Sequence, residues 1–212
     1  MTASNYFDEL PGPEAGTEGR RGRKKRATAH RIFRSAITLM RAEGFHSVTI
    51  EQICDHADVA RATFFQHFAN KAALLGFFSS VVCQRIEIEL QLRVYNPAEQ
   101  LALIADHLQL LTDELGPIAP DMLSAFIADP GSHFHIDKPK TGISALVVQS
   151  IHKGQEEGIF DRSWHPNDVA ICLVSAWVGL GRQRVANPKA EESPAYHAVL
   201  DLISRGVMAQ KT

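Results

Sequence analysis

The chain has 212 residues, of which 45% are hydrophobic and 22% charged, a composition typical of soluble globular proteins. Its longest apolar stretch, around Val169 to Leu180, is too short to span a bilayer, and the N-terminus lacks the apolar segment of a secretory signal. The three cysteines, Cys54, Cys83 and Cys172, are odd in number and widely spaced. They argue against a disulfide framework or a zinc site and favour reduced thiols in the cytoplasm.

Charge is distributed unevenly along the chain, although the net charge is only −2. Residues 1–19 carry four acids and no bases, residues 20–71 carry eleven bases against four acids, and residues 72–212 carry eleven bases against sixteen acids. The middle segment therefore has a net charge of +7, and the segments on either side have −4 and −5. Positive charge gathered in one segment is the pattern expected of a phosphate-binding surface.

Residues 1–26 are predicted to be disordered, because they are rich in Gly, Pro and charged residues and show no apolar periodicity. The basic run RRGRKKR, from Arg20 to Arg26, has two interpretations. It can be a solvated leader, or a flexible arm that lies along phosphates or enters the minor groove, as homeodomain arms do. We favour the arm, and the residues expected to contact DNA are Arg23, Lys24, Lys25 and Arg26.

Two helices are predicted after this run. The first extends from about Thr28 to Glu43 and stops at Gly44, since glycine readily takes the left-handed conformation that ends helices. The second follows Thr49, whose hydroxyl can form a capping box with Gln52 three residues later. Apolar residues recur at helical spacing along one face of each segment, which predicts a small helical core.

A third helix, from about Ala60 to Phe68, comes directly after a turn that is too tight for an ordinary loop. Phe64 and Phe68 are one helical turn apart, so both point inward. The opposite face is small and uncharged except at its first residue, as expected of a helix that enters the DNA major groove in a helix–turn–helix. That face comprises Arg61, Ala62, Thr63 and Gln66, with Phe65 and His67 on its flanks.

The run from Arg31 to Leu75 resembles the DNA-binding domain of TetR-family transcriptional regulators. The resemblance rests on IFRSAITLMRAEGF, VTIEQICDHADV and RATFFQHFANKAALL, and most specifically on Val-x-x-x-Thr-Phe-aromatic-x-His-Phe-x-Asn-Lys, which ends at Lys71. Three positions depart from the family pattern. Asp58 replaces a turn glycine, Ala60 replaces the usual serine cap of the recognition helix, and Phe65 replaces a common tyrosine.

The resemblance implies an all-α fold of about nine helices, with a helix–turn–helix domain at residues 27–75 and a helical domain for effector binding and dimerisation at residues 76–212. It implies a bacterial cytoplasmic protein that is associated with the nucleoid when bound to DNA. The residues expected to face bases are Arg61, Ala62, Thr63 and Gln66. The residues expected to face mainly phosphates are Thr49, His67, Lys71 and the basic arm, and Phe65 completes the DNA-binding set.

The rest of the chain also has helical periodicity, with no strand-like alternation and no internal repeat. Asn70 is expected to cap the fourth helix, and a Gly/Pro-containing loop is expected from Asp129 to Lys140. The helices predicted after residue 70 run from there to about 95, and over 98–115, 121–128, 141–157, 166–186 and 194–209.

In proteins of this family the C-terminal bundle usually encloses a pocket for a small, largely apolar effector. If this chain has such a pocket, its apolar lining is expected from the helices between residues 98 and 186, although ordinary core packing explains each residue equally well. Gln149 and His152 are the polar contacts expected there. The apolar candidates are Leu108, Leu111, Met122, Phe126, Val148, Ile151 and Trp177.

The last two helices have features that suit self-association. In the family, two such helices from each chain form a four-helix dimer interface. Packing of the same residues into the internal core of one chain is the alternative. The dimer is favoured because two recognition helices related by two-fold symmetry read a near-palindromic operator, whereas one reads only a few base pairs. The interface candidates are Val174, Val178, Gly181, Leu200, Ile203 and Val207.

The function predicted from these features is that of a ligand-responsive repressor, which needs no cofactor. Alternatives are an activator of the same fold, or a regulator that senses oxidants through Cys54 or a metal through His133 and His135. No phosphate-binding glycine loop, nucleophile elbow or HExxH motif occurs, so enzymatic activity is not expected.

Overall fold

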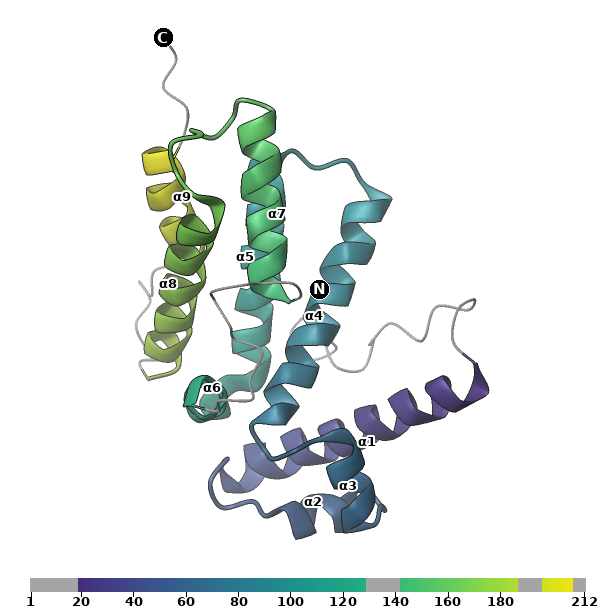
Figure 1. The fold of residues 1–212 in the computed structure, drawn as a ribbon. Helices are drawn as coiled ribbons and strands as arrows, with labels where there is room; N and C mark the ends of the chain where they lie inside the picture. The colour runs from purple at the N-terminus through teal and green to yellow at the C-terminus, as the bar shows by residue number, and fades with distance from the viewer. Residues whose placement is uncertain (1–18, 129–141, 187–195, 208–212) are drawn as a thin grey trace. The chain divides into compact units, whose positions relative to one another are not determined.

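The computed structural model describes residues 19–128, 142–186 and 196–207, and its regular elements are all helical (Figure 1), as the sequence predicts. The described residues form two compact units. The first unit contains residues 19–78 and 114–128, and the second contains residues 79–113, 142–186 and 196–207. The end of the fifth helix and the sixth helix therefore group with the helix–turn–helix.

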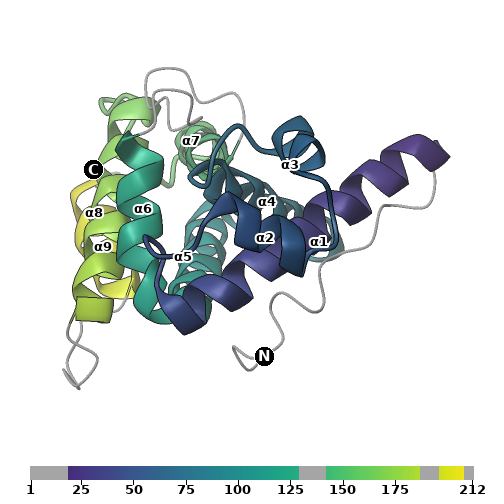
Figure 2. The ribbon, with the colours of Figure 1, turned by 90° about the horizontal axis from the view of Figure 1, so that it is seen from below.

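The first unit is built on α1 (Arg20–Glu43), α2 (Ile50–His56) and α3 (Arg61–His67), together with the start of α4 (Ala73–Leu92). Their core is mainly apolar, and the large side chains that face it are completely enclosed. Figure 2 shows α2 and α3 beside the C-terminal part of α1, whose first turns extend beyond them. Large buried members of this core include Ile32, Phe33, Met40, Ile53, Phe64 and Leu74.

Helix α1 begins at Arg20, not near Thr28, so the expectation of a disordered segment up to residue 26 is wrong for residues 20–26. These residues are exposed or half-exposed and therefore show no apolar periodicity, which is why the sequence pattern did not reveal the helix. Arginine and lysine are good helix formers, and no proline interrupts them. The helix ends at Gly44 with φ 90°, where the glycine N–H donates to the carbonyl of Met40 at 2.8 Å, as predicted.

Helix α2 has the capping box that the sequence predicts. The Thr49 hydroxyl accepts from the N–H of Gln52 at 3.2 Å, and the Gln52 side chain accepts from the N–H of Thr49 at 2.7 Å. At the other end, Asp58 has φ 49°, and the N–H groups of Asp58 and Val59 donate to Asp55 and Cys54. This is a Schellman motif, in which glycine is the preferred residue at the position of Asp58.

The remaining helices of the first unit are held to α1 by polar contacts. A short 3₁₀ turn (Gly116–Ile118) leads into α6 (Ala119–Ala128), after the last residues of α5 (Pro97–Leu115). The Arg41 guanidinium forms an ion pair of 2.6 Å with the buried carboxylate of Glu114 and also donates to its backbone carbonyl. His46 lies 3.6 Å from the carboxylate of Asp121. The α1 helix and the segment around α6 are thereby joined within one unit.

The second unit contains most of α4 and α5 and the helices α7 (Ile143–Glu156), α8 (Pro166–Ala186) and α9 (Tyr196–Val207). Helix α8 contacts α7 on one side and α9 on the other (Figure 1). The Ser150 hydroxyl donates to the Gln100 side chain at 3.1 Å and so joins α7 to α5. The indole N–H of Trp177 donates to the carbonyl of Tyr196 at 3.2 Å and joins α8 to α9.

The helix boundaries agree with the predicted ones within a few residues, the start of α1 excepted. Among the described residues, no helix is both long enough and apolar enough to cross a membrane. The predicted loop at residues 129–140 lies outside the described residues. The candidate metal ligands His133 and His135 therefore lie outside them as well.

Candidate nucleic-acid interface

Helix α3 separates an apolar inner face from an exposed outer face. Phe64 and Phe68 are buried, with their ring centres 5.6 Å apart, and Phe68 contacts Phe77 of α4 edge to face. The helix therefore has a fixed orientation in the unit, because its aromatic residues are locked on one side. Its outer face presents four exposed side chains, with Phe65 among them in place of the predicted Thr63, and Thr63 and His67 are half-exposed at the margins. The exposed residues are Arg61, Ala62, Phe65 and Gln66.

The start of α3 lacks a side-chain cap, because Ala60 occupies the N-cap position and offers no hydrogen-bond acceptor. Its first residue, Arg61, pairs with Glu51 of α2 at 2.7 Å, and its guanidinium carbon lies 5.6 Å from the centre of the Phe65 ring. Sequence reasoning did not assign Glu51 to this surface. The spacing of Arg61 and Phe65, four residues apart on one helix, was a signal for their contact, whereas the contact with Glu51 depends on how α2 and α3 pack.

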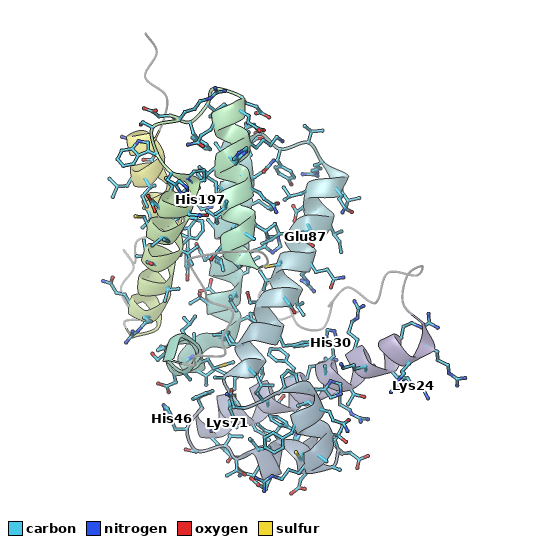
Figure 3. All side chains as sticks on the ribbon, in the orientation of Figure 1. Lys24, His30, His46, Lys71, Glu87 and His197 are labelled. Carbon is cyan, nitrogen blue, oxygen red and sulfur yellow. The ribbon has the colours of Figure 1, made fainter. Side chains whose placement is uncertain are left out.

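The first two turns of α1 place positive charge next to α3. Burial lowers the pKa of His67 below its usual value, and the charge of Lys25 lowers it further, so Lys25 of α1 lies close to the end of α3. Burial also lowers the pKa of His30, with contributions from Arg26 and Arg34. Figure 3 shows Lys24 near the free end of α1. The first turns of α1 thus carry exposed bases, one of which acts on His67 of α3, and this positive charge favours binding of a polyanion.

Lys71, expected to face a phosphate, is half-exposed and makes hydrogen bonds within the domain. Its ammonium group donates to the carbonyl oxygens of Phe45 at 2.9 Å and Val48 at 2.7 Å, and it lies 5.0 Å from the centre of the Phe45 ring (Figure 3). Burial lowers the pKa of Lys71. The structure therefore shows Lys71 as a link between the start of α4 and the segment between α1 and α2. Asn70 caps α4 as predicted, since its side chain accepts from the N–H of Ala73 at 2.9 Å.

Comparison with known proteins agrees with this geometry. Residues 32–76 match the family model described as bacterial regulatory proteins, tetR family. This segment belongs to the TetR family. The TetR-family segment covers α1 from Ile32, both helices of the helix–turn–helix and the start of α4.

Individual relatives match part of the chain. The HTH-type transcriptional regulator TcmR of Streptomyces glaucescens is 43% identical over 53 residues, which are 25% of this chain and 24% of TcmR. The transcriptional regulator MftR of Mycobacterium tuberculosis is 37% identical over 83 residues, which are 36% of this chain and 42% of MftR. The chain thus aligns with less than half the length of these curated relatives.

The similarity of fold extends further than that of sequence. The crystal structure of the transcriptional regulator FadR from Bacillus subtilis, in complex with stearoyl-CoA, has a TM-score of 0.64 at 19% identity. The match covers 84% of this chain and 98% of that chain. At this identity the match shows the fold alone. The all-helical TetR-like fold is confirmed.

The Cys54 thiol has the environment of a structural residue in the TetR-family domain. It is 4% exposed, and its pKa is raised first by burial and then by Glu51 and Asp55, while Arg61 opposes them. A redox-sensing cysteine needs an accessible thiolate with a lowered pKa. The geometry therefore does not support the alternative of an oxidant sensor at Cys54.

The candidate pocket residues are divided between the two units. Met122 is buried in the first unit, and the side chain of Phe126 lies outside the described residues. In the second unit, Gln149 and His152 are exposed on α7, and His152 lies 3.3 Å from Glu156. These two residues face solvent, so the structure gives them no place among buried ligand contacts. Leu111, Ile151 and Trp177 are buried, and Leu108 and Val148 are half-buried.

Several predicted dimer residues are enclosed within one chain. Val174 and Leu200 are buried, and Gly181 lies against Tyr196 and Thr112, whose hydroxyl oxygens are 2.6 Å apart. These three residues therefore pack α8 against α9 and α5 and are not available to a second copy. Val178 and Ile203 are half-buried, and the side chain of Val207 lies outside the described residues. Among the described side chains of α9, Leu202 is a large apolar residue that is exposed, at 73%.

Proposed function

We propose that this protein is a ligand-responsive repressor that binds a near-palindromic DNA operator as a homodimer. The observation that carries the proposal is the outer face of α3, which is exposed, almost uncharged and fixed in orientation by the buried Phe64 and Phe68. Such a face can enter the major groove without carrying a large charge into it. The basic first turns of α1 lie beside it and supply the attraction for phosphates.

In this proposal, α3 contacts the DNA bases and α1 contacts the DNA backbone. Gln66, Thr63 and Arg61 carry hydrogen-bonding groups on the outer face of α3 and would read base edges in the major groove. The cations of α1 would contact phosphates and add affinity without sequence choice. The hydroxyl of Thr49 accepts from Gln52 and keeps its own proton for donation to a phosphate. Lys71 has a supporting role in this scheme, since two of its three N–H donors are used within the domain.

Dimerisation would place two α3 helices on successive major grooves, about 34–36 Å apart. We assign the interface to the outer surfaces of α8 and α9, where Leu202 is exposed and Gly179 has no atom within 4 Å of the position of an added Cβ. We place an apolar effector in the second unit, near Leu108, Val148 and Trp177. The solved FadR structure of similar fold contains stearoyl-CoA. Induction would follow if the effector favours a spacing of the two α3 helices that does not match the operator.

The test is selection of bound sequences from a random duplex library at about physiological salt. A two-fold symmetric consensus with half-sites about one helical turn apart is expected. In the selected duplex, Gln66→Ala should relax the base preference at one position, whereas Lys24→Met should weaken all duplexes to a similar degree. If neither the wild-type chain nor these variants prefer any sequence, the proposed function is wrong.

The effector is tested separately, with stearoyl-CoA as the first probe. Binding should raise the melting temperature of the protein and release the selected duplex, because a ligand that binds one state better shifts the population toward it. A rise in melting temperature without release would mean that the ligand does not distinguish the two states.

A further inference from the structure

An acidic residue of α2 lies against the first residue of α3. The Glu51 carboxylate is 2.7 Å from the Arg61 guanidinium, whose carbon lies 5.6 Å from the centre of the Phe65 ring. All three residues are exposed, with 56% of the Glu51 side chain, 64% of the Arg61 side chain and 44% of Phe65 accessible. They form one group on the outer face of the helix–turn–helix, which we name the Glu51–Arg61–Phe65 cluster.

Fold stability does not explain this cluster. An ion pair that is exposed on both sides contributes little to folding, since water screens it and ordering two flexible side chains opposes it. A carboxylate on a surface that faces DNA also repels phosphates. Glu51 therefore reduces the general attraction of Arg61 for the DNA backbone. Its contribution to binding is instead to orient the Arg61 guanidinium.

The contacts of Arg61 restrict its orientation and leave donors available. A guanidinium has five N–H donors in a planar fork, and the contact with Glu51 involves Nη1. The ring of Phe65 lies on another side of the same group. An arginine that is held in this way can present its remaining donors to the O6 and N7 atoms of guanine, the commonest base-specific contact of arginine.

Phe65 offers a second, apolar element of recognition. The ring has no hydroxyl and cannot donate to a phosphate, yet it is exposed on the face that would enter the groove. In the major groove the apolar group of a base is the C5 methyl of thymine, which phenylalanine can contact. Arg61 and Phe65 are neighbours on the helix surface, four residues apart, so their targets should be adjacent base pairs.

We propose that Glu51 is a positioning residue that directs Arg61 to a guanine, and that Phe65 contacts the methyl group of an adjacent thymine. Each operator half-site then contains a guanine and a thymine on neighbouring base pairs where the start of α3 meets the groove. The inference rests on the proposed function, because it requires a duplex bound at α3.

The first part of the test uses modified bases in the duplex selected by the wild-type chain. Replacing the guanine by 7-deazaguanine removes N7, and replacing the thymine by uracil removes only the methyl group. We expect binding about tenfold weaker for the first change and about threefold weaker for the second. In Phe65→Ala the uracil duplex should bind as tightly as the thymine duplex, while the sensitivity to 7-deazaguanine remains.

The second part tests Glu51 through discrimination between bases, which a merely structural role would not change. In Glu51→Gln we expect the preference for guanine over the other bases to fall about tenfold, while binding to unrelated duplexes becomes tighter and more dependent on salt. Asp55→Asn is the matched control, because Asp55 is also an exposed acid of α2, one turn further along. It should keep the preference for guanine, and melting temperatures check that both variants fold.

The possible results separate this inference from the proposed function. If the wild-type chain selects a symmetric sequence, but the modified bases bind normally or Glu51→Gln discriminates as the wild type does, the inference is wrong and the proposed function stands. If the wild-type chain selects no sequence, both are wrong.

Discussion

The ammonium group of Lys71 donates to the carbonyl oxygen of Val48 across 2.7 Å. A second bond to Phe45 satisfies another donor, so one side chain at the start of α4 closes the segment between α1 and α2. The position of the second helix relative to the first is therefore fixed partly by a lysine that family resemblance assigns to DNA.

Lys71→Met should lower the free energy of unfolding by about 1–3 kcal/mol, because the carbonyl groups of Phe45 and Val48 lose a charged donor. DNA affinity should fall with little change in its dependence on salt, since no phosphate contact is removed. Lys24→Met is the control: Lys24 is exposed on α1, so its loss should reduce the salt slope by about one unit without affecting unfolding. Urea unfolding and a salt titration of duplex binding measure both effects. A reduced salt slope in Lys71→Met at unchanged stability would restore the phosphate assignment.

Gly181→Ala should destabilise the second unit. An added Cβ would lie 2.8 Å from the Tyr196 hydroxyl oxygen and 3.3 Å from that of Thr112, and would disturb the buried hydrogen bond between them. The expected loss is about 1–3 kcal/mol in the free energy of unfolding. Gly179→Ala is the control on the same helix, because its Cβ would meet no atom within 4 Å. Equal unfolding free energies for the two variants would contradict this account of the packing.

Leu202→Glu should convert the proposed homodimer to monomers and weaken binding to the proposed operator. Leu202 is 73% exposed on α9, and a charge there would be buried by a partner helix in the proposed interface. Leu92→Glu is the control, since Leu92 is similarly exposed, at 77%, but lies at the end of α4. Sedimentation at several protein concentrations gives the association constant of each variant. A dimer that survives Leu202→Glu unchanged would exclude this surface as the interface.

The features that sequence could predict are those that depend on residues close together in the chain. The capping box at Thr49 and the inward rings of Phe64 and Phe68 each follow from spacings of four residues or fewer. The outer face of α3 follows from the same spacing. These local rules were sufficient to identify the helix–turn–helix and its exposed residues.

Contacts between distant segments were not predictable in the same way. Lys71 meets carbonyl groups 23 and 26 positions earlier, and the sequence pattern cannot distinguish this contact from one with a phosphate. Gly181 permits close packing, but the sequence does not show whether the neighbour belongs to the same chain. The first turns of α1 carry no apolar stripe, so neither their helical state nor their place beside α3 was evident.

Lowering the pH should destabilise the protein, and buried His107 should account for part of the loss. His107 is 7% exposed and lies 3.3 Å from the carboxylate of Glu89. Burial lowers its pKa below the usual value of 6.5, Glu89 and Asp106 partly oppose this effect, and Arg85 adds to it. Well above pH 6.5 the imidazole is neutral in both the folded and the unfolded chain, so it contributes no pH dependence there. Below that value the unfolded chain takes up a proton that the folded chain resists, and stability falls until the lowered pKa is reached.

The pKa values of His30 and His67 are lowered as well, so these residues contribute in the same direction. His107→Gln should therefore make the decline in unfolding free energy between about pH 6.5 and pH 5 less steep without abolishing it. Urea unfolding at a series of pH values measures the slope, and substitution of the exposed His165 by glutamine controls for the loss of a histidine. If the slope in His107→Gln equals that of the wild type, burial of His107 does not limit stability in acid, and His30 and His67 become the residues to test.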